Sequence, residues 1–327
     1  MHSFCTLFDS FYLSRGLALY RSLERTCPAF HLYIFAFDER SLSVLRHLEL
    51  KHATVIGLSE FEDARLLDVK PSRTRAEYCW TSTSSTILYV LEHYDVSECT
   101  YIDADMMFFA SPEPLFEEMG GASIMITEHR YTPRYDKSRQ SGKYCVQFVT
   151  FKKDERGLAA LRWWRERCLE WCYDRHEDGK FGDQKYLDDW PARFTGVHVM
   201  QHLGGGMAAW NVQQYDVFHK SDGVYARELT TGREFRLIFY HFHYLRFLAD
   251  NRIELGRRIL SPDVLSLIYT PYIRRLFEAK KEIARIDDRF DPNGIAQEKA
   301  LWKRPILYVY RKALGIYNIF DIQKFLV

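Results

Sequence analysis

The sequence lacks an excess of charge of either sign. Its 45 Lys and Arg residues nearly balance its 44 Asp and Glu residues, which leaves a formal net charge of +1. Proteins that bind nucleic acid through the phosphate backbone usually carry a clear positive excess. The composition therefore argues against nucleic acid as a partner.

The sequence also lacks cysteine pairs and long apolar runs. Its seven cysteines are scattered, with no C-x-x-C pair, which is typical of reduced thiols in a cytosolic protein. No apolar run approaches the roughly 20 residues of a membrane-spanning helix. The first residues do not resemble a signal peptide. We therefore expect a cytoplasmic protein that contacts at most the inner face of a membrane.

The sequence does contain short apolar runs that alternate with amphipathic stretches. The runs at residues 3–8, 31–37, 53–58 and 100–102 predict strands, and the stretches at 13–23, 39–47 and 83–94 predict helices. This alternation is typical of an α/β fold whose sheet is covered by helices on both faces. Ligands of such folds bind beyond the carboxyl ends of the strands.

The composition changes near residue 250, where basic and aromatic residues begin to alternate with aliphatic ones. We predict a first domain of residues 1–249 and a helical C-terminal appendage of residues 250–327. Such helices either lie on an anionic membrane surface or pack on the domain with solvated charges. In the first case, removing residues 256–327 should release the protein from liposomes and leave the activity of the first domain intact.

Two carboxylates interrupt the apolar run Y-I-D-A-D-M-M-F-F at residues 101–109. If the backbone stays extended there, Asp103 and Asp105 project to the same face. Two such charges repel each other, and a divalent cation between them removes the conflict. The cation would keep coordination positions for a phosphate-bearing substrate. The pair therefore predicts a metal site.

Four blocks together resemble the GT-A-type glycosyltransferases of family 8, between Ser3 and about Arg246. They are T-L-F-D at residues 6–9, D-A-D at 103–105, F-G-D-Q-K-Y-L-D-D-W-P at 181–191 and Y-H-F-H-Y-L-R at 240–246. The resemblance implies a Rossmann-like mixed sheet with helices on both faces. It also implies transfer of a hexose from a nucleotide diphosphate sugar, with a UDP-sugar favoured, to a glycan or glycolipid, with retention of configuration.

The resemblance also implies roles for individual residues. The nucleotide would lie against Thr6, Leu7, Phe8 and Asp9. The metal, Mn²⁺ or Mg²⁺, would be held by Asp103 and Asp105, which flank Ala104, and by a third ligand, His241 or His243. The family pattern H-x-x-G favours His241, although Tyr244 stands at the glycine position.

Further donor contacts follow from the same resemblance. Asp183 and Gln184 would contact the sugar, Arg246 a phosphate and Gly205 the diphosphate or sugar. Arg75, or else Arg73, would replace an arginine of the family, and Trp80 and Thr81 would border the donor. Simpler structural roles exist for several of these: Asp183 as a helix N-cap, Gly205 as a turn and Trp80 as core. The loop of residues 128–143 is expected to help choose the acceptor.

Two other functions remain open from the sequence. The D-x-D pattern also occurs in phosphatases of the haloacid dehalogenase type, where Asp103 would be the nucleophile. A non-catalytic module that binds a sugar nucleotide without turnover is the other alternative.

Overall fold

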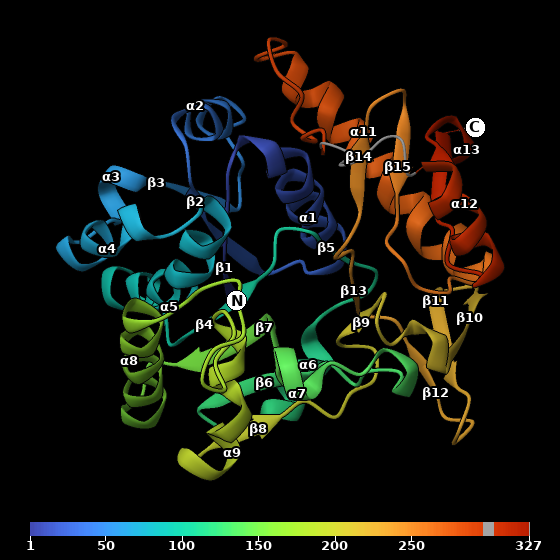
Figure 1. Ribbon diagram of the computed structural model, residues 1–327. Helices are drawn as coiled ribbons and strands as arrows, with labels where there is room; N and C mark the ends of the chain where they lie inside the picture. Colours follow the sequence, from blue (N-terminus) through green and yellow to red (C-terminus); the bar gives the residue numbers. More distant parts are fainter. Residues whose placement is uncertain (297–303, 327) are drawn as a thin grey trace.

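The computed structural model describes residues 1–296 and 304–326 (Figure 1). Seven strands form the central sheet, in the order β3-β2-β1-β4-β7-β6-β8. They are β1 (His2–Phe8), β2 (Phe30–Ala36), β3 (Ala53–Gly57), β4 (Glu98–Ile102), β6 (Ile124–Glu128), β7 (Tyr144–Lys152) and β8 (Val197–Val199). The first four are parallel, whereas β7 runs antiparallel to β4. The predicted mixed α/β sheet is confirmed.

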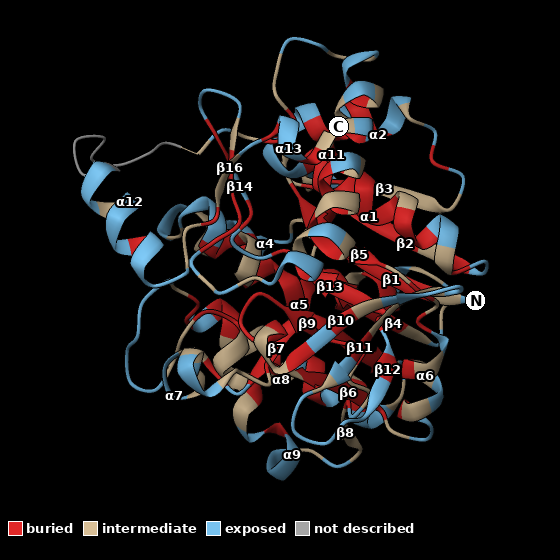
Figure 2. Ribbon diagram, turned by 90° about the vertical axis from the view of Figure 1, so that its right-hand side faces the viewer, coloured by how far each residue is buried: buried red, intermediate tan, exposed pale blue. Residues whose placement is uncertain are grey.

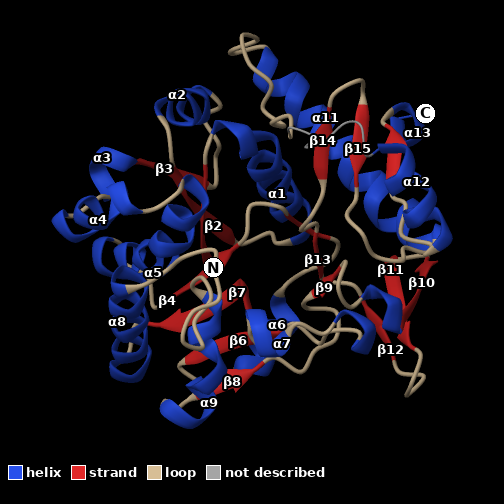
Figure 3. Cartoon of the chain, in the orientation of Figure 1, coloured by secondary structure: helices blue, strands red, loops and turns tan. Residues whose placement is uncertain are grey.

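Helices cover both faces of this sheet, as predicted (Figure 3). Phe4 and Phe8 of β1 belong to a core shared with α1 (Leu13–Thr26) and α2 (Glu39–His47). Cys5 and Leu7 belong to a core shared with α5 (Arg75–His93) and α8 (Glu155–Glu170). Alternate residues of a strand face opposite sides, so a strand covered twice must be apolar throughout. The inner strands are accordingly buried (Figure 2).

Local sequence signals explain where these helices begin. Asp38 caps α2 by accepting a hydrogen bond from the Ser41 N–H, at the predicted start. Helix α5 begins at Arg75, earlier than the predicted residue 83, because Thr74 and Glu77 form a capping box. The shorter helices before residue 200 are α3 (Leu58–Phe61), α4 (Ala64–Val69), α6 (Glu113–Met119), α7 (Ser138–Ser141) and α9 (Trp190–Arg193).

A second, small sheet lies at the end of β4. It consists of β5 (Met106–Phe108), β13 (Phe239–His241) and β9 (Met207–Ala208). Strand β13 runs antiparallel to β5, with His241 opposite Met106. The apolar run at residues 235–243 belongs to two strands, because β12 (Glu234–Arg236) pairs with β11 (Gly223–Glu228), which pairs with β10 (Tyr215–Lys220).

The C-terminal part contains strands as well as helices. Strands β14 (Arg246–Leu248), β15 (Arg252–Glu254) and β16 (Ile319–Asp321) form a further sheet, separate from that of β10 to β12, which the sequence did not predict. The helices are α10 (Pro262–Val264), a π-helical turn (Leu265–Tyr269), α11 (Thr270–Ala284), α12 (Arg304–Ala313) and α13 (Gln323–Leu326). Among the described residues, no helix is long and apolar enough to cross a bilayer.

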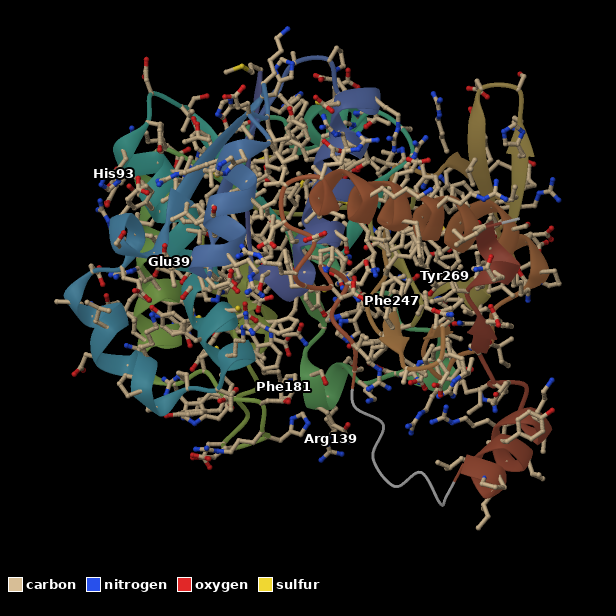
Figure 4. The ribbon with its side chains drawn as sticks, turned by 90° about the horizontal axis from the view of Figure 1, so that it is seen from above. Glu39, His93, Arg139, Phe181, Phe247 and Tyr269 are labelled. Atoms are coloured by element: carbon tan, nitrogen blue, oxygen red, sulfur yellow. The ribbon has the colours of Figure 1, made fainter. Side chains whose placement is uncertain are left out.

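The C-terminal part packs closely on the first helix of the chain. Ala279 and Ile283 of α11 belong to the same core as α1. The Ser14 hydroxyl donates to the Asn293 side-chain oxygen (2.6 Å). By contrast, α12 stands out from the body (Figures 2 and 4). The boundary at residue 249/250 stays a prediction, but this packing argues against removing residues 256–327 without effect.

Candidate functional site

The two aspartates lie in a turn between β4 and β5. The Met106 N–H donates to the Asp103 carbonyl (3.2 Å), and the Asp103 N–H donates to the Gln147 carbonyl of β7 (3.1 Å). The expected extended backbone is therefore wrong. The expected convergence is nevertheless present, because the Nε2 atom of His241 lies 3.6 Å from an oxygen of Asp103 and 3.1 Å from one of Asp105. Ala104, between them, is buried.

The orientation of His241 is fixed by Gln147. The Nδ1 atom of His241 lies 2.7 Å from the side-chain oxygen of Gln147. An amide oxygen only accepts, so Nδ1 donates and Nε2 faces the carboxylates. A ligand histidine is usually held in this way through its other nitrogen. Sequence reasoning missed Gln147, whose one signal is a lone amide in the apolar strand Y-C-V-Q-F-V-T-F.

These side chains fit a divalent cation. One ligand atom each from Asp105, His241 and His243 lies within 4.8 Å of the others. Ligand atoms on opposite sides of such an ion are roughly 4–5 Å apart, and carboxylate oxygens suit Mg²⁺ and Mn²⁺. Trp210 packs edge-on against both imidazoles, with ring centres 5.3 and 5.8 Å away. His243 follows the end of β13 instead of continuing the strand, yet it reaches the same point.

Burial and neighbouring charges shift the pKa values of all four of these side chains. Burial raises the pKa of Asp103 to about 6, although the His241 cation opposes it. For Asp105 the His241 cation outweighs burial and lowers the pKa to about 2. The carboxylates in turn raise the pKa of His241 above its ordinary value, against the effect of burial. Enclosure by the cavity walls, together with His241, lowers the pKa of His243 to about 4.

A buried arginine stands behind the aspartates. Arg15 of α1 is 3% exposed, and its guanidinium donates to the carbonyls of Phe11 (3.3 Å), Asn293 (2.7 Å) and Leu245 (3.3 Å). Burial raises the pKa of Asp105, and the two histidines lower it. The positive charge of Arg15 lowers it further by a smaller amount. Sequence reasoning missed it, because one arginine in an amphipathic helix gives no signal.

Asp103, His241 and His243 line a cavity of about 400 Å³, the first cavity. Asp183, Gln184 and Trp80 also line it, so the structure brings these predicted residues together. Other parts of its wall are His129, Tyr131, Lys137, Ser141, Trp210, Tyr244 and Arg258. The wall thus joins the segment after β6, the end of β13 and the C-terminal part of the chain.

Asp183 and Gln184 face this cavity from a 3-10 helix, η4 (Gln184–Asp189). The Asp183 side chain does not cap that helix, so the alternative N-cap role is wrong. Asp183 is 6% exposed, and burial, with the Asp103 charge adding to it, raises its pKa to about 7. The Gln184 amide donates to the Ser141 carbonyl (2.5 Å) and so fastens α7 to η4.

Two cations in the wall contact no carboxylate among the described residues. One is Lys137, which is exposed in the segment just before α7. The other is Arg258, whose guanidinium lies 4.5 Å from the Tyr135 ring centre and donates to the Arg257 carbonyl. The structure corrects the placement of Arg246, which does not line the cavity and instead pairs with Glu254 (2.6 Å). Arg258 lines the cavity and Arg246 does not.

Other predicted donor residues lie outside the lining of the first cavity. Thr6, Leu7 and Phe8 are buried in β1, and Thr81 is buried with its hydroxyl on the Glu77 carbonyl. Gly205 is a packing glycine, since an added Cβ would lie 2.4 Å from the Met200 sulfur. This packing accounts for the glycine, and its contact with the donor stays a prediction.

At the carboxyl end of β1, Asp9 forms a separate cluster with Arg75. A guanidinium nitrogen of Arg75 lies 2.5 Å from Asp9 and another 3.0 Å from Asp38. The Phe11 ring centre lies 4.8 Å from the same guanidinium. This charged and aromatic group occupies the sheet edge at which α/β folds bind ligands.

Comparison with known proteins finds relatives of nearly full length. The uncharacterised protein YfnD of Bacillus subtilis (strain 168) is 32% identical over 296 residues, which cover 88% of this chain and 91% of YfnD. YfnF of the same organism is 31% identical over 304 residues, 90% of this chain and 98% of YfnF. No protein-family model matches the chain.

Among solved structures, the chain is similar to the galactosyltransferase LgtC in complex with donor and acceptor sugar analogues. The TM-score is 0.51 and the sequence identity 11%, over 84% of this chain and 95% of that one. At this identity the likeness concerns the fold.

Proposed function

Because the chain belongs to the family of YfnD and YfnF and has the GT-A fold, we propose that it is a metal-dependent glycosyltransferase. It would move a hexose from a nucleotide diphosphate sugar, with a UDP-sugar favoured, to a glycan or glycolipid of a cell surface. We propose retention of configuration at the transferred sugar. The fold speaks against the phosphatase of the haloacid dehalogenase type, since that reading rested on the D-x-D pattern alone.

The single observation that carries this proposal is the pairing of β13 with β5. It sets His241 beside the D-A-D turn, although 136 and 138 positions separate it from Asp105 and Asp103 in the chain, and it does so at the wall of a cavity. A buried structural ion pair would not need a third ligand, an open cavity and unpaired cations beside it.

The metal would be Mn²⁺ or Mg²⁺, held by Asp103, Asp105 and His241 with His243. When bound, it supplies positive charge where the nucleoside diphosphate leaving group becomes negative. Lys137 and Arg258 would hold phosphate oxygens, since they line the same cavity without carboxylate partners. These cations replace the proposed phosphate contact of Arg246.

The remaining donor contacts stay proposals. The nucleotide would lie against the end of β1, at Thr6 to Phe8, with Asp9 and Arg75 at its edge. Asp183 would accept hydrogen bonds from sugar hydroxyls, and Gln184 would lie across the sugar from the leaving group. Trp80, which lines the cavity, would border the sugar, with Thr81 supporting it from inside α5.

A panel of nucleotide sugars, scored for Mn²⁺-dependent release of nucleoside diphosphate, tests the proposal. We expect turnover of at least one donor, and Asp105→Ala should abolish it. Asp95→Ala, which alters an exposed aspartate outside the cavity, is the matched control and should retain activity. Unchanged turnover in Asp105→Ala would refute the metal assignment. Donor binding without turnover would favour the non-catalytic module.

We also propose peripheral contact with the inner face of a membrane through α12. Its side chains Ile306, Val309 and Tyr310 are 68%, 66% and 59% exposed and lie on one side of the helix. An exposed apolar stripe of this kind is usually an interaction surface. Val309→Glu should reduce binding to anionic liposomes, whereas Leu229→Glu, which alters another exposed residue, should not. Absence of liposome binding by the unaltered protein would end this idea.

A further inference from the structure

A second cavity, of about 590 Å³, adjoins the first. Tyr131 belongs to the walls of both. The wall between them is built from α7 and η4, which each contribute to both sides. Ser141 and Gln184 face the first cavity, whereas Ser138 and Lys185 face the second.

This partition is held by specific hydrogen bonds. The Lys185 ammonium donates to the Ser138 carbonyl (3.0 Å), and the Lys143 N–H donates to a carboxylate oxygen of Asp188 (2.7 Å). The Gln184 amide adds its bond to Ser141. The two cavities are therefore neighbouring compartments that share Tyr131 and are separated by α7 and η4.

The charges that line the second cavity cancel. Its acids are Glu128, Asp136, Asp188 and Glu228, and its bases are Arg130, Arg139, Lys143 and Lys185. Two of the pairs are in contact, Lys185 with Asp188 (2.6 Å) and Lys143 with Glu128 (3.8 Å). A cavity with this balance offers no net attraction for an anion or a cation.

The lining offers many hydrogen-bond donors and acceptors beside two aromatic rings. Tyr131 and Tyr215 supply rings, and Gln214 and the carboxylates supply acceptors. One carboxylate oxygen of Glu228 takes a bond from the Thr231 hydroxyl, which leaves the other for a ligand. Neutral polyhydroxylated molecules need this combination, because each hydroxyl both donates and accepts.

The floor of the cavity is rigid. Arg130 has a φ of +49° and donates to the carbonyls of Met200 (2.6 Å), His202 (3.3 Å) and Gly205 (3.0 Å). A non-glycine residue in this conformation is costly unless its surroundings hold it there. The three hydrogen bonds to carbonyls hold Arg130 in this conformation. Because its guanidinium is used in this way, Arg130 forms part of the floor and does not offer an anion site.

From this arrangement we propose that the second cavity binds a neutral oligosaccharide, the part of the acceptor next to its reacting sugar. The inference rests on the proposed glycosyl transfer, which it deepens by assigning the acceptor class. The diphosphate belongs in the first cavity, where cations are unpaired. The neutral sugar belongs in the second, where equal numbers of acidic and basic residues leave no net charge.

Direct binding tests the assignment without requiring turnover. The probes are an array of neutral oligosaccharides, an array of uronic-acid or sialylated ones, and the best neutral oligosaccharide linked to a lipid in phosphatidylcholine vesicles. We expect binding of neutral members. Equal binding of the free and lipid-linked forms identifies a glycan acceptor, and preference for the vesicle form identifies a glycolipid, both in agreement with the proposal.

Three variants make the test specific. Glu228→Ala and Arg139→Ala should weaken neutral-oligosaccharide binding about tenfold each, since each removes charged hydrogen bonds worth about 1.5 kcal/mol or more. Glu228→Gln keeps the shape of the side chain and guards against misfolding. Asp216→Ala is the control, because Asp216 is exposed, follows Tyr215 in β10 and points to the other face of the strand.

Two outcomes would overturn the inference: binding of acidic saccharides alone, or neutral binding that is unchanged in both Glu228 variants and in Arg139→Ala. Failure of the proposed function is seen separately. If neutral oligosaccharides bind as expected but no nucleotide sugar is turned over, the glycosyltransferase proposal fails and the saccharide site stands. Donor turnover without any saccharide binding would refute saccharide binding in the second cavity and would support the glycosyltransferase proposal for the first.

Discussion

Gln147 is uncharged, yet it holds both an aspartate and a histidine of the cluster in place. Its backbone carbonyl accepts from Asp103, and its side-chain oxygen accepts from His241. Residues that orient a metal ligand typically contribute 10- to 100-fold to metal affinity. Gln147→Leu should therefore weaken Mn²⁺ binding about 10- to 100-fold. Calorimetric titration with Mn²⁺ measures this, with Gln323→Leu, in the C-terminal helix α13, as the control.

The raised pKa of Asp183 predicts a pH dependence of stability in the metal-free protein. Above its ordinary value of 3.8, the carboxyl ionises in the unfolded chain but stays protonated in the folded one until about pH 7. Folding then takes up a proton, so stability falls as the pH rises through this window. The difference between these pKa values corresponds to at most about 4 kcal/mol.

Asp183→Asn should remove the loss of stability that accompanies the rise in pH from about 4 to about 7. The stability of the variant relative to the unaltered protein should therefore increase from pH 4 to pH 7 and then level off. Urea unfolding in EDTA at each pH gives the comparison. A difference between the two proteins that does not change with pH would contradict the raised pKa.

At the residue scale, the sequence predicted the members of the site that stand in a pattern. Asp103, Asp105 and His241 were found because D-A-D and a histidine on a late strand recur together in one family. Arg15, Gln147 and Arg258 were not, since nothing in their neighbouring residues distinguishes them from surface or core positions. Their roles come from contacts between residues far apart in the sequence.

At the element scale, α7 depends on η4 for its position. It has four residues, too few to be stable alone. The Gln184 amide contributes one of the bonds that fasten it, and a hydrogen bond is worth about 0.5–1.5 kcal/mol. In Gln184→Ala, α7 should therefore detach from η4 and unfold locally more often.

Limited trypsin digestion measures this opening, because Arg134, Lys137 and Arg139 lie in or next to the segment, and Arg139 is at the surface (Figure 4). We expect cleavage there roughly two- to tenfold faster in Gln184→Ala. Gln140→Ala alters a residue of the same helix whose side chain has no hydrogen bond within the described part of the chain, and it should be cut at the original rate. Equal rates in both variants would mean that Gln184 does not hold α7.

The length of an element decided whether the sequence revealed it. Strands β1 to β4 and helices α1 and α2 were predicted, since each shows a sustained apolar run or several turns of amphipathic pattern. Strands β5, β9 and β14 to β16 have two or three residues each, too few to show alternation. Strands β5, β9 and β16 form because partners distant in the chain supply the opposite edge, and β5 with β13 is the pair on which the site depends.

At the scale of the whole molecule, the C-terminal part and the first domain should unfold together. Leu276 of α11 is fully buried, and α11 packs on α1. Leu276→Ala should destabilise the whole protein by about 2–5 kcal/mol, within one urea transition. Lys281→Ala, on the exposed side of the same helix, should change stability by less than about 0.5 kcal/mol. A separate early transition in Leu276→Ala would instead show that residues 250–327 unfold alone.

The bond between Ser14 and Asn293 joins positions 279 apart. In a chain made from its N-terminus, α1 therefore leaves the ribosome long before the segment that closes over it, and Arg258 also arrives late. A nascent chain that ends before residue 258 already contains the aspartates and histidines of the cluster. It still lacks the Asn293 side chain that bonds to α1 and the Arg258 cation of the first cavity. If the proposed function holds, a chain that stops before residue 258 should not turn over a nucleotide sugar.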